Sequence, residues 1–104
     1  ILSRPARPTG RGRKALSSAV QQEADRHGIA CITPTNLRGR EDLVADLDFL
    51  VVAAYGMILP PEIFHGPQIA SLNVHASLLP RWRGAAPIER SIMAGDSETG
   101  ISIM

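Results

Sequence analysis

Cysteine, aromatic residues and long apolar runs are all scarce in this chain of 104 residues. The one cysteine, Cys31, cannot form an internal disulfide and has no partner at metal-ligand spacing, which excludes disulfide-rich scaffolds and cysteine-ligated zinc sites. We interpret Cys31 as a small apolar residue in a buried strand. No apolar run approaches the roughly 20 residues that cross a bilayer, so no membrane-spanning helix is expected.

The chain also lacks an initiator methionine and a terminal turn signal. It begins at Ile1, and Met104 ends it inside an apolar run, so both ends are expected to be cuts in a longer sequence. Arg4, Arg7 and Arg11 stand where a signal peptide would carry its apolar core. We expect a soluble protein that is not exported.

Acidic residues are missing from the first part of the chain, although the formal net charge is only +1. Five bases precede the first acid, Glu23, while the rest of the chain has 6 bases against 10 acids. The asymmetry indicates a basic arm that meets phosphates, although a solvated loop explains the charge equally well.

From Leu16 onward the pattern predicts alternating helices and strands. Apolar spacing from residue 16 to 24 predicts a helix, with Ser18 and Gln21 at capping-box spacing and Gly28 as its stop. Residues 29–33 read as a short strand, 43–47 as a helix and 49–54 as a second strand. Further on, 72–75 reads as a strand, 85–94 as a helix with Pro87 in its first turn, and 101–104 as the start of another strand.

The run from Phe49 to Ala54 is continuously apolar, which favours a central strand covered on both faces of a parallel sheet. Helices that alternate with strands predict an α/β fold with a doubly wound, mostly parallel sheet. Ligands of such sheets bind beyond the carboxyl ends of the strands, where Tyr55, Gly56 and residues 73–75 lie.

Asn73 and His75 are two residues apart, so on an extended strand both side chains project from one face. An amide can donate to a developing oxyanion and an imidazole can carry protons near neutral pH, a pair that suits acyl transfer. From this spacing alone, a purely structural strand-end pair is the commoner explanation.

The segment from Ser77 to Ile88 is unusual for a generic loop, since Pro80 fixes the backbone and two arginines flank Trp82. Arg81 and Arg83 could reach an anionic ligand, or Trp82 could simply anchor the loop against the core.

These motifs resemble the folate-dependent formyltransferase family. The resemblance rests on Asn73-Val74-His75 followed by Ser77-Leu78-Leu79-Pro80, and on the segment from Ala54 to Pro60. The run from Arg81 to Ile88, with Gly95-Asp96 and Glu98-Thr99-Gly100, is similar to the members that act on methionyl-tRNA, as is the basic segment from Arg7 to Lys14. The resemblance implies a Rossmann-like formyltransferase domain, here without its first and later strands, in which 1–15 is a tRNA-binding loop, 16–104 is the α/β core, and a C-terminal domain is absent.

The resemblance further implies a formyl donor, 10-formyltetrahydrofolate, and an acceptor, the amino group of initiator methionyl-tRNA in translation initiation, with no metal. It implies a cytoplasmic or organellar enzyme that is a monomer when complete. The implied catalytic residues are Asn73 and His75. The implied folate-binding residues are Tyr55, Gly56, Met57, Ile58, Leu59, Ser77, Leu78, Leu79 and Pro80, and the implied tRNA-binding residues are Arg7, Arg11, Arg13 and Lys14.

The family's third catalytic residue, an aspartate that orients the histidine, has no counterpart in this chain, and Asp96 does not match it. We therefore expect this polypeptide alone to be inactive. Two alternatives remain: a sugar-nucleotide formyltransferase, which the basic segment and Trp82 disfavour, and a non-catalytic RNA-binding fragment. A nicotinamide-binding domain is a weak third, because no Gly-x-Gly-x-x-Gly follows a strand.

Overall fold

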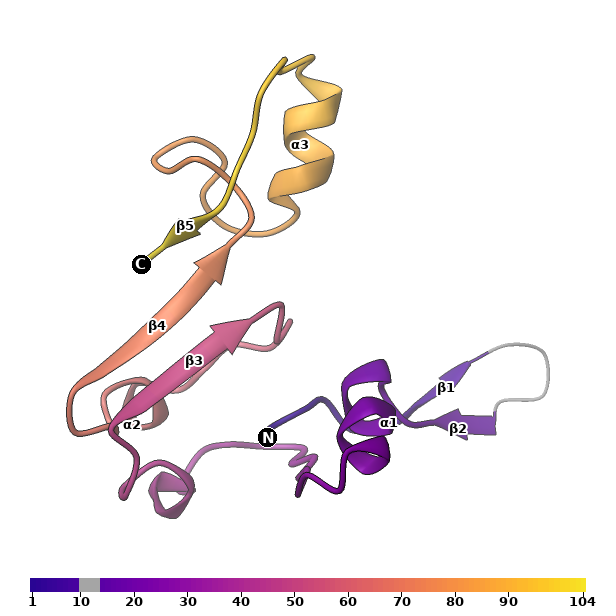
Figure 1. Cartoon of the computed structure of the whole chain (residues 1–104), viewed down its shortest axis with the longest axis vertical. Coiled ribbons are helices and arrows are strands. Elements are labelled where there is room, and N and C mark those ends of the chain that lie inside the picture. Colours follow the sequence, from indigo (N-terminus) through magenta and orange to yellow (C-terminus); the bar gives the residue numbers. More distant parts are fainter. Residues whose placement is uncertain (10–13) are drawn as a thin grey trace.

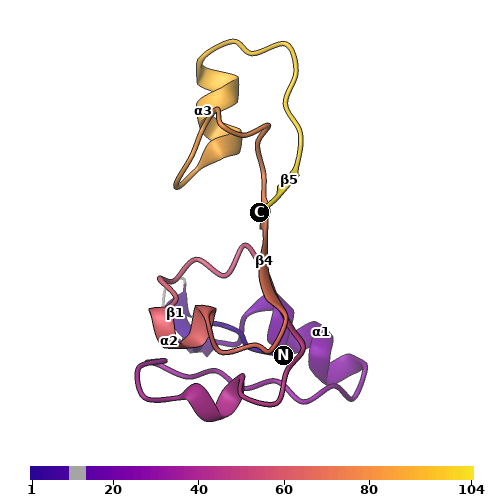
Figure 2. The same cartoon turned by 90° about the vertical axis from the view of Figure 1, so that its left-hand side faces the viewer.

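A three-stranded sheet forms the centre of the computed structural model, which describes residues 1–9 and 14–104 (Figure 1). Strand β4 (Ala70–His75) lies in the middle, with β3 (Phe49–Ala53) parallel on one side and β5 (Ser102–Ile103) antiparallel on the other. The strands predicted at 72–75 and 101–104 are confirmed. In Figure 2, β4 runs between the part of the chain that holds α3 and the part that holds α1 and α2.

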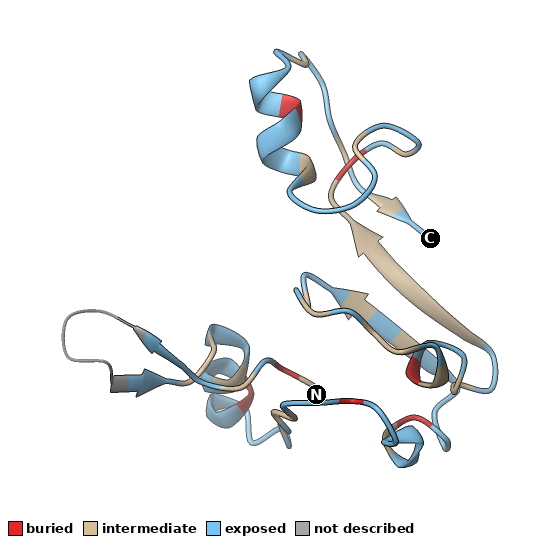
Figure 3. Ribbon diagram, turned by 180° about the vertical axis from the view of Figure 1, so that it is seen from behind, coloured by how far each residue is buried: buried red, intermediate tan, exposed pale blue. Residues whose placement is uncertain are grey.

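The prediction that 49–54 forms a strand is confirmed, but the prediction that this strand is buried and central is wrong. The segment is a parallel strand, but it lies at the edge of the described sheet and its burial alternates. Phe49 and Val51 are 49% and 64% exposed, while Leu50 packs against the core. The alternation appears along the β3 arrow in Figure 3 as bands of exposed and intermediate residues. A continuously apolar strand needs cover on both faces, and the described residues cover only the face that Leu50 shares.

The core lies beneath β3 and is small. Leu37, Val44 and Ile63 are its buried residues, contributed by a loop, by the end of a 3-10 turn (η1, Glu41–Leu43) and by helix α2 (Pro61–Phe64). A Cβ on Gly66 would lie 2.3 Å from a methyl carbon of Val44, so the chain can pass this close only with glycine there. The sequence did not predict α2.

The helix expected at 43–47 is wrong: this part of the chain forms only the 3-10 turn of η1, at Glu41–Leu43. Val44 donates its backbone N–H to Glu41, and Leu47 is already outside the helix and exposed. One turn is enough to bury Val44 before the chain enters β3, so the apolar spacing overstated the helix.

Helix α1 (Ala19–Arg26) begins after a cap at Ser18, whose Oγ accepts from the N–H of Gln21 at 3.0 Å. Gly28, with φ of +63°, follows its carboxyl end as predicted. The helix starts later than the sequence suggested, because Leu16 belongs to an antiparallel hairpin of β1 (Arg7–Thr9) and β2 (Lys14–Leu16).

The strand expected at 29–33 is wrong. Only Ile32 forms a bridge, parallel to Leu2, and Cys31 is half-buried outside any described strand. Pro34 lacks an N–H to donate and follows closely, which keeps the segment from extending into a ladder.

Helix α3 (Pro87–Met93) lies inside the predicted 85–94, with Pro87 at its first position. The described helices are too short and too polar to span a membrane. Within 1–9 and 14–104, no three His, Cys, Asp or Glu side chains are grouped to hold a metal ion.

Candidate active site

The carboxyl end of β4 brings Asn73 and His75 to one cavity of about 430 Å³. The strand is extended over both residues, which is the condition for their side chains to share a face. The lining residues are Asn73, His75, Leu79, Arg83, Gly84 and Met104. The cavity therefore joins an amide, an imidazole and a guanidinium, which come from a strand and the loop that follows it.

His75 is held on one side only. Its Nδ1 lies 3.0 Å from the hydroxyl of Ser77, while its Nε2 is covered and has no hydrogen-bond partner among the described residues. Ser77 is fully buried and its Oγ donates to the carbonyl of Arg81 at 2.8 Å. Its hydroxyl is thus occupied inside the loop and does not line the cavity.

A second serine fastens the same loop to β5. Ser102 Oγ donates to the carbonyl of Ser77 at 2.8 Å and accepts from the N–H of Leu79 at 3.0 Å. Leu78 packs instead against Gly100, where an added Cβ would lie 2.7 Å from its Cδ2. Of the four predicted ligand-binding residues 77–80, Leu79 alone lines the cavity.

Arg81 and Arg83, which the sequence left equivalent, are separated by the structure. Arg81 donates two hydrogen bonds to Asp96, at 2.9 and 2.7 Å, and its guanidinium lies 4.4 Å from the ring centre of Trp82. Trp82 Nε1 donates to the same carboxylate at 2.6 Å. Trp82 is therefore an anchor, held through Asp96, and Arg83 is the arginine that faces the cavity.

The hydrogen bonds that Arg81 and Trp82 donate to the carboxylate of Asp96 should be lost in acid. The hydrogen bonds from Arg81 and then Trp82 lower the pKa of Asp96 to about 2. A carboxyl whose pKa is lower in the folded state stabilises that state above its unfolded pKa, near 3.9, and this stabilisation is lost as the pH falls. We expect the fluorescence of Trp82 to change between about pH 4 and pH 2. Subtraction of a Trp82→Phe spectrum isolates the signal, and the step should vanish in Asp96→Asn. An identical step in that variant would contradict the assignment.

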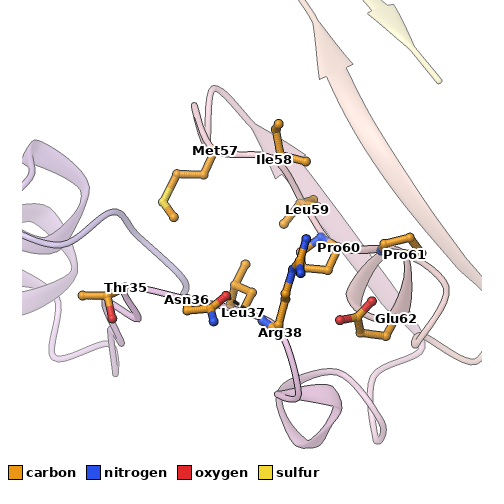
Figure 4. Close-up of a pocket in the computed structure, with 10 residues that line it drawn as sticks. All are labelled: Thr35, Asn36, Leu37, Arg38, Met57, Ile58, Leu59, Pro60, Pro61 and Glu62. Atoms are coloured by element: carbon orange, nitrogen blue, oxygen red, sulfur yellow. Dashed lines mark hydrogen bonds between the residues drawn. The ribbon is translucent and has the colours of Figure 1, made fainter.

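A larger cavity of about 530 Å³ lies beside the segment that follows β3 (Figure 4). Met57, Ile58 and Leu59, all predicted to bind the folate, line it together with the loop from Thr35 to Arg38. The loop from Thr35 to Arg38 was not among the site residues predicted from the sequence. The signal for it is local, because Asn36 Oδ1 accepts from the N–H of Arg38 at 3.0 Å and turns the chain after Pro34.

Tyr55 and Gly56, the other two residues of that predicted segment, do not line either cavity. Tyr55 packs against the core, its hydroxyl is buried without a partner in the described structure, and burial raises its pKa. Gly56 has a φ of +68°, and the guanidinium of Arg4 lies 3.1 Å from where its Cβ would be. These two residues shape the turn that presents Met57 to Leu59.

Two of the four residues predicted to bind tRNA, Arg7 and Lys14, belong to the strands of the hairpin. Arg7 is exposed at the start of β1, and Lys14 begins β2 opposite Thr9. Arg11, Arg13 and the side chain of Lys14 lie outside the described residues.

A family model described as formyl transferase matches residues 1–104. The chain belongs to the formyl transferase family. It is 54% identical to a methionyl-tRNA formyltransferase of Thiobacillus denitrificans and 56% identical to one of Aromatoleum aromaticum, and both alignments cover all of this chain. They cover 35% and 34% of those proteins, so the chain spans about a third of the relatives' length.

The fold of this family member also matches a solved structure. Glycinamide ribonucleotide transformylase 1 from Geobacillus kaustophilus superposes with a TM-score of 0.67 at 24% identity, covering 81% of this chain and 50% of that one. The likeness supports the partial Rossmann-like α/β fold predicted from the sequence. Within that fold, the polar cavity lies at the carboxyl end of β4, as ligand sites do in open α/β sheets.

Proposed function

We propose that, within the full-length protein, this chain transfers a formyl group from 10-formyltetrahydrofolate to the amino group of initiator methionyl-tRNA. The observation that carries the proposal is the placement of Asn73 and His75 on one face of β4, in one cavity with Arg83. The names of relatives more than half identical over the whole chain support the choice of acceptor.

The proposed reaction needs stabilisation of an oxyanion and transfer of a proton, and these residues can provide both. The amine nitrogen bonds to the formyl carbon, whose carbonyl electron pair moves onto oxygen; collapse then breaks the bond to N10 of the folate. Asn73 can donate to the oxyanion while it exists. One proton leaves the attacking nitrogen and one reaches N10, and His75 can carry it between them.

The folate is assigned to the loops at the strand ends. Met57, Ile58 and Leu59 offer an apolar wall in a cavity large enough for a flat ring, and Leu79 offers a second apolar contact beside Asn73. We propose no metal, because acyl transfer to an amine needs only a hydrogen-bond donor for the oxyanion and a base for the proton.

The tRNA is assigned to the basic hairpin. Arg7 is exposed on β1 and Lys14 begins β2, and in the sequence Arg11 and Arg13 stand between these two strands. Such a segment suits phosphate contacts, which are electrostatic and sensitive to salt.

We further propose a cytoplasmic or organellar enzyme that acts as a monomer.

The test is formylation of methionyl-tRNA by the full-length protein, with and without Arg11→Ala. The wild type should formylate the charged tRNA, and Arg11→Ala should weaken tRNA use and reduce the logarithmic salt slope by about 1. Folate affinity should not change. Arg26→Ala is the matched control, because Arg26 is an exposed base paired with Glu23 on α1.

Two results would contradict these assignments. Unchanged tRNA use in Arg11→Ala, with the full salt dependence, would exclude the hairpin as the tRNA contact. Formylation of an amino-sugar nucleotide in place of methionyl-tRNA would move the protein to the alternative acceptor class.

A further inference from the structure

The single hydroxyl proton of Ser77 decides the protonation of His75. Ser77 Oγ lies 2.8 Å from the carbonyl oxygen of Arg81, and a carbonyl oxygen can only accept. The hydroxyl proton is therefore directed to Arg81. The contact of 3.0 Å between Ser77 Oγ and His75 Nδ1 then needs its proton from the ring, so Nδ1 is the protonated nitrogen.

The arrangement leaves the other ring nitrogen as the reactive one. A neutral imidazole with its proton on Nδ1 has a lone pair on Nε2. That atom is covered and has no partner in the described structure, and His75 is one of the residues that line the same cavity as Asn73. An unpaired buried acceptor is costly, and a proton donor entering this cavity would satisfy it.

The hydroxyl of Ser77 has little freedom to choose other partners. The residue is 0% exposed, so solvent does not compete, and its carbonyl accepts from Ser102. Ser102 in turn accepts from the N–H of Leu79, which fixes the loop on both sides of the hydroxyl.

We propose that Ser77 is a positioning residue, which holds His75 in the Nδ1-protonated tautomer and so presents the Nε2 lone pair to the reacting amine. The role replaces direct ligand binding by this serine, whose side chain is buried in the loop. It rests on the proposed function for its kinetic consequence, but the tautomer itself does not.

The test combines nitrogen-15 NMR of the neutral His75 ring with kinetics, in the full-length protein. In the wild type, Nδ1 should carry the proton; the signals are assigned by comparison with His75→Gln. In Ser77→Ala, Nδ1 and the carbonyl of Arg81 both lose their partner, and the ring should shift toward the Nε2-protonated form. We expect kcat to fall about ten-fold or more. This loss should be smaller than the roughly 10⁴-fold loss in kcat seen when the carboxylate that orients a serine-protease histidine is neutralised. The KM for folate should stay constant.

Two further variants separate positioning from general support. Ser77→Thr keeps a hydroxyl and should restore the tautomer and most of kcat. Ser102→Ala removes bonds from the same loop without touching the imidazole, so it should lower thermal stability and leave the Nδ1 proton in place.

Three outcomes would overturn the inference. The first is a wild-type ring protonated on Nε2, which needs no variant and no activity. The second is a Ser77→Ala protein that keeps both its tautomer and its kcat, as it would if a carboxylate elsewhere in the full-length protein held Nδ1. The third is a tautomer change of equal size in Ser102→Ala. A wild type with the expected tautomer but no formyl transfer would instead contradict the proposed function alone.

Discussion

Replacement of Asn73 by alanine should lower turnover by about a hundred-fold or more, as does loss of a single donor from other oxyanion holes. The amide of Asn73 lines the cavity beside His75, and its proposed bond to the formyl oxygen strengthens only as negative charge develops. The loss should therefore fall on kcat, with folate affinity largely retained. The measurement is turnover per folded molecule in the full-length protein, together with folate affinity.

Ser71→Ala is the matched control for this variant. Ser71 points from the same face of β4 as Asn73, but its Oγ donates to the carbonyl of Phe64 at 2.6 Å, away from the cavity. Its loss should cost stability and spare turnover. If Asn73→Ala behaved like Ser71→Ala, Asn73 would be a structural residue of the strand.

His75→Ala should lower kcat by about 10²-fold to 10⁴-fold, the usual contribution of a positioned general acid or base. Its ring is the proton carrier of the proposed reaction and reaches the cavity from the last residue of β4. Folate binding should persist, because Met57, Ile58 and Leu59 line a different cavity. Single-turnover formylation and folate titration measure the two effects separately.

His65→Ala controls for the loss of an imidazole elsewhere, since His65 is exposed and its ring packs edge-on against Phe64.

The kcat of the double variant Asn73→Ala/His75→Ala should fall by less than the product of the two single losses, because the effects of residues that act on one transition state are not additive. Near-normal turnover in His75→Ala would remove the histidine from the mechanism.

The sequence predicted best those elements whose signals are local. Ser18 caps α1 because a hydroxyl before a helix can accept from its free N–H groups, and Pro87 starts α3 because it has no N–H to lose. The alternation of polar and apolar residues up to His75 predicted the extended end of β4 correctly, and with it the shared face of Asn73 and His75.

These local sequence signals did not predict which elements and side chains pack against one another in the fold. The apolar run of β3 indicated what the strand can bury and not which elements cover it, so the exposed Val51 was unforeseen. Likewise, two arginines on either side of Trp82 look equivalent in the sequence, and only the position of Asp96 beside Arg81 distinguishes them. The role of Ser77 depends on a carbonyl four residues later, whose direction no pattern of residue types specifies.

The backbone of Asn73 is fixed by hydrogen bonds, which has a consequence for the energetics of the proposed reaction. Its N–H and C=O exchange bonds with Met104, at 2.7 and 3.1 Å, while Val52 is its register partner in the parallel ladder with β3 on the opposite side. The strand that carries the amide therefore cannot swing, and only the last rotations of the side chain remain to be set. A donor mounted in this way requires little reorganisation as charge appears on the substrate, so more of its dipole is available to lower the barrier.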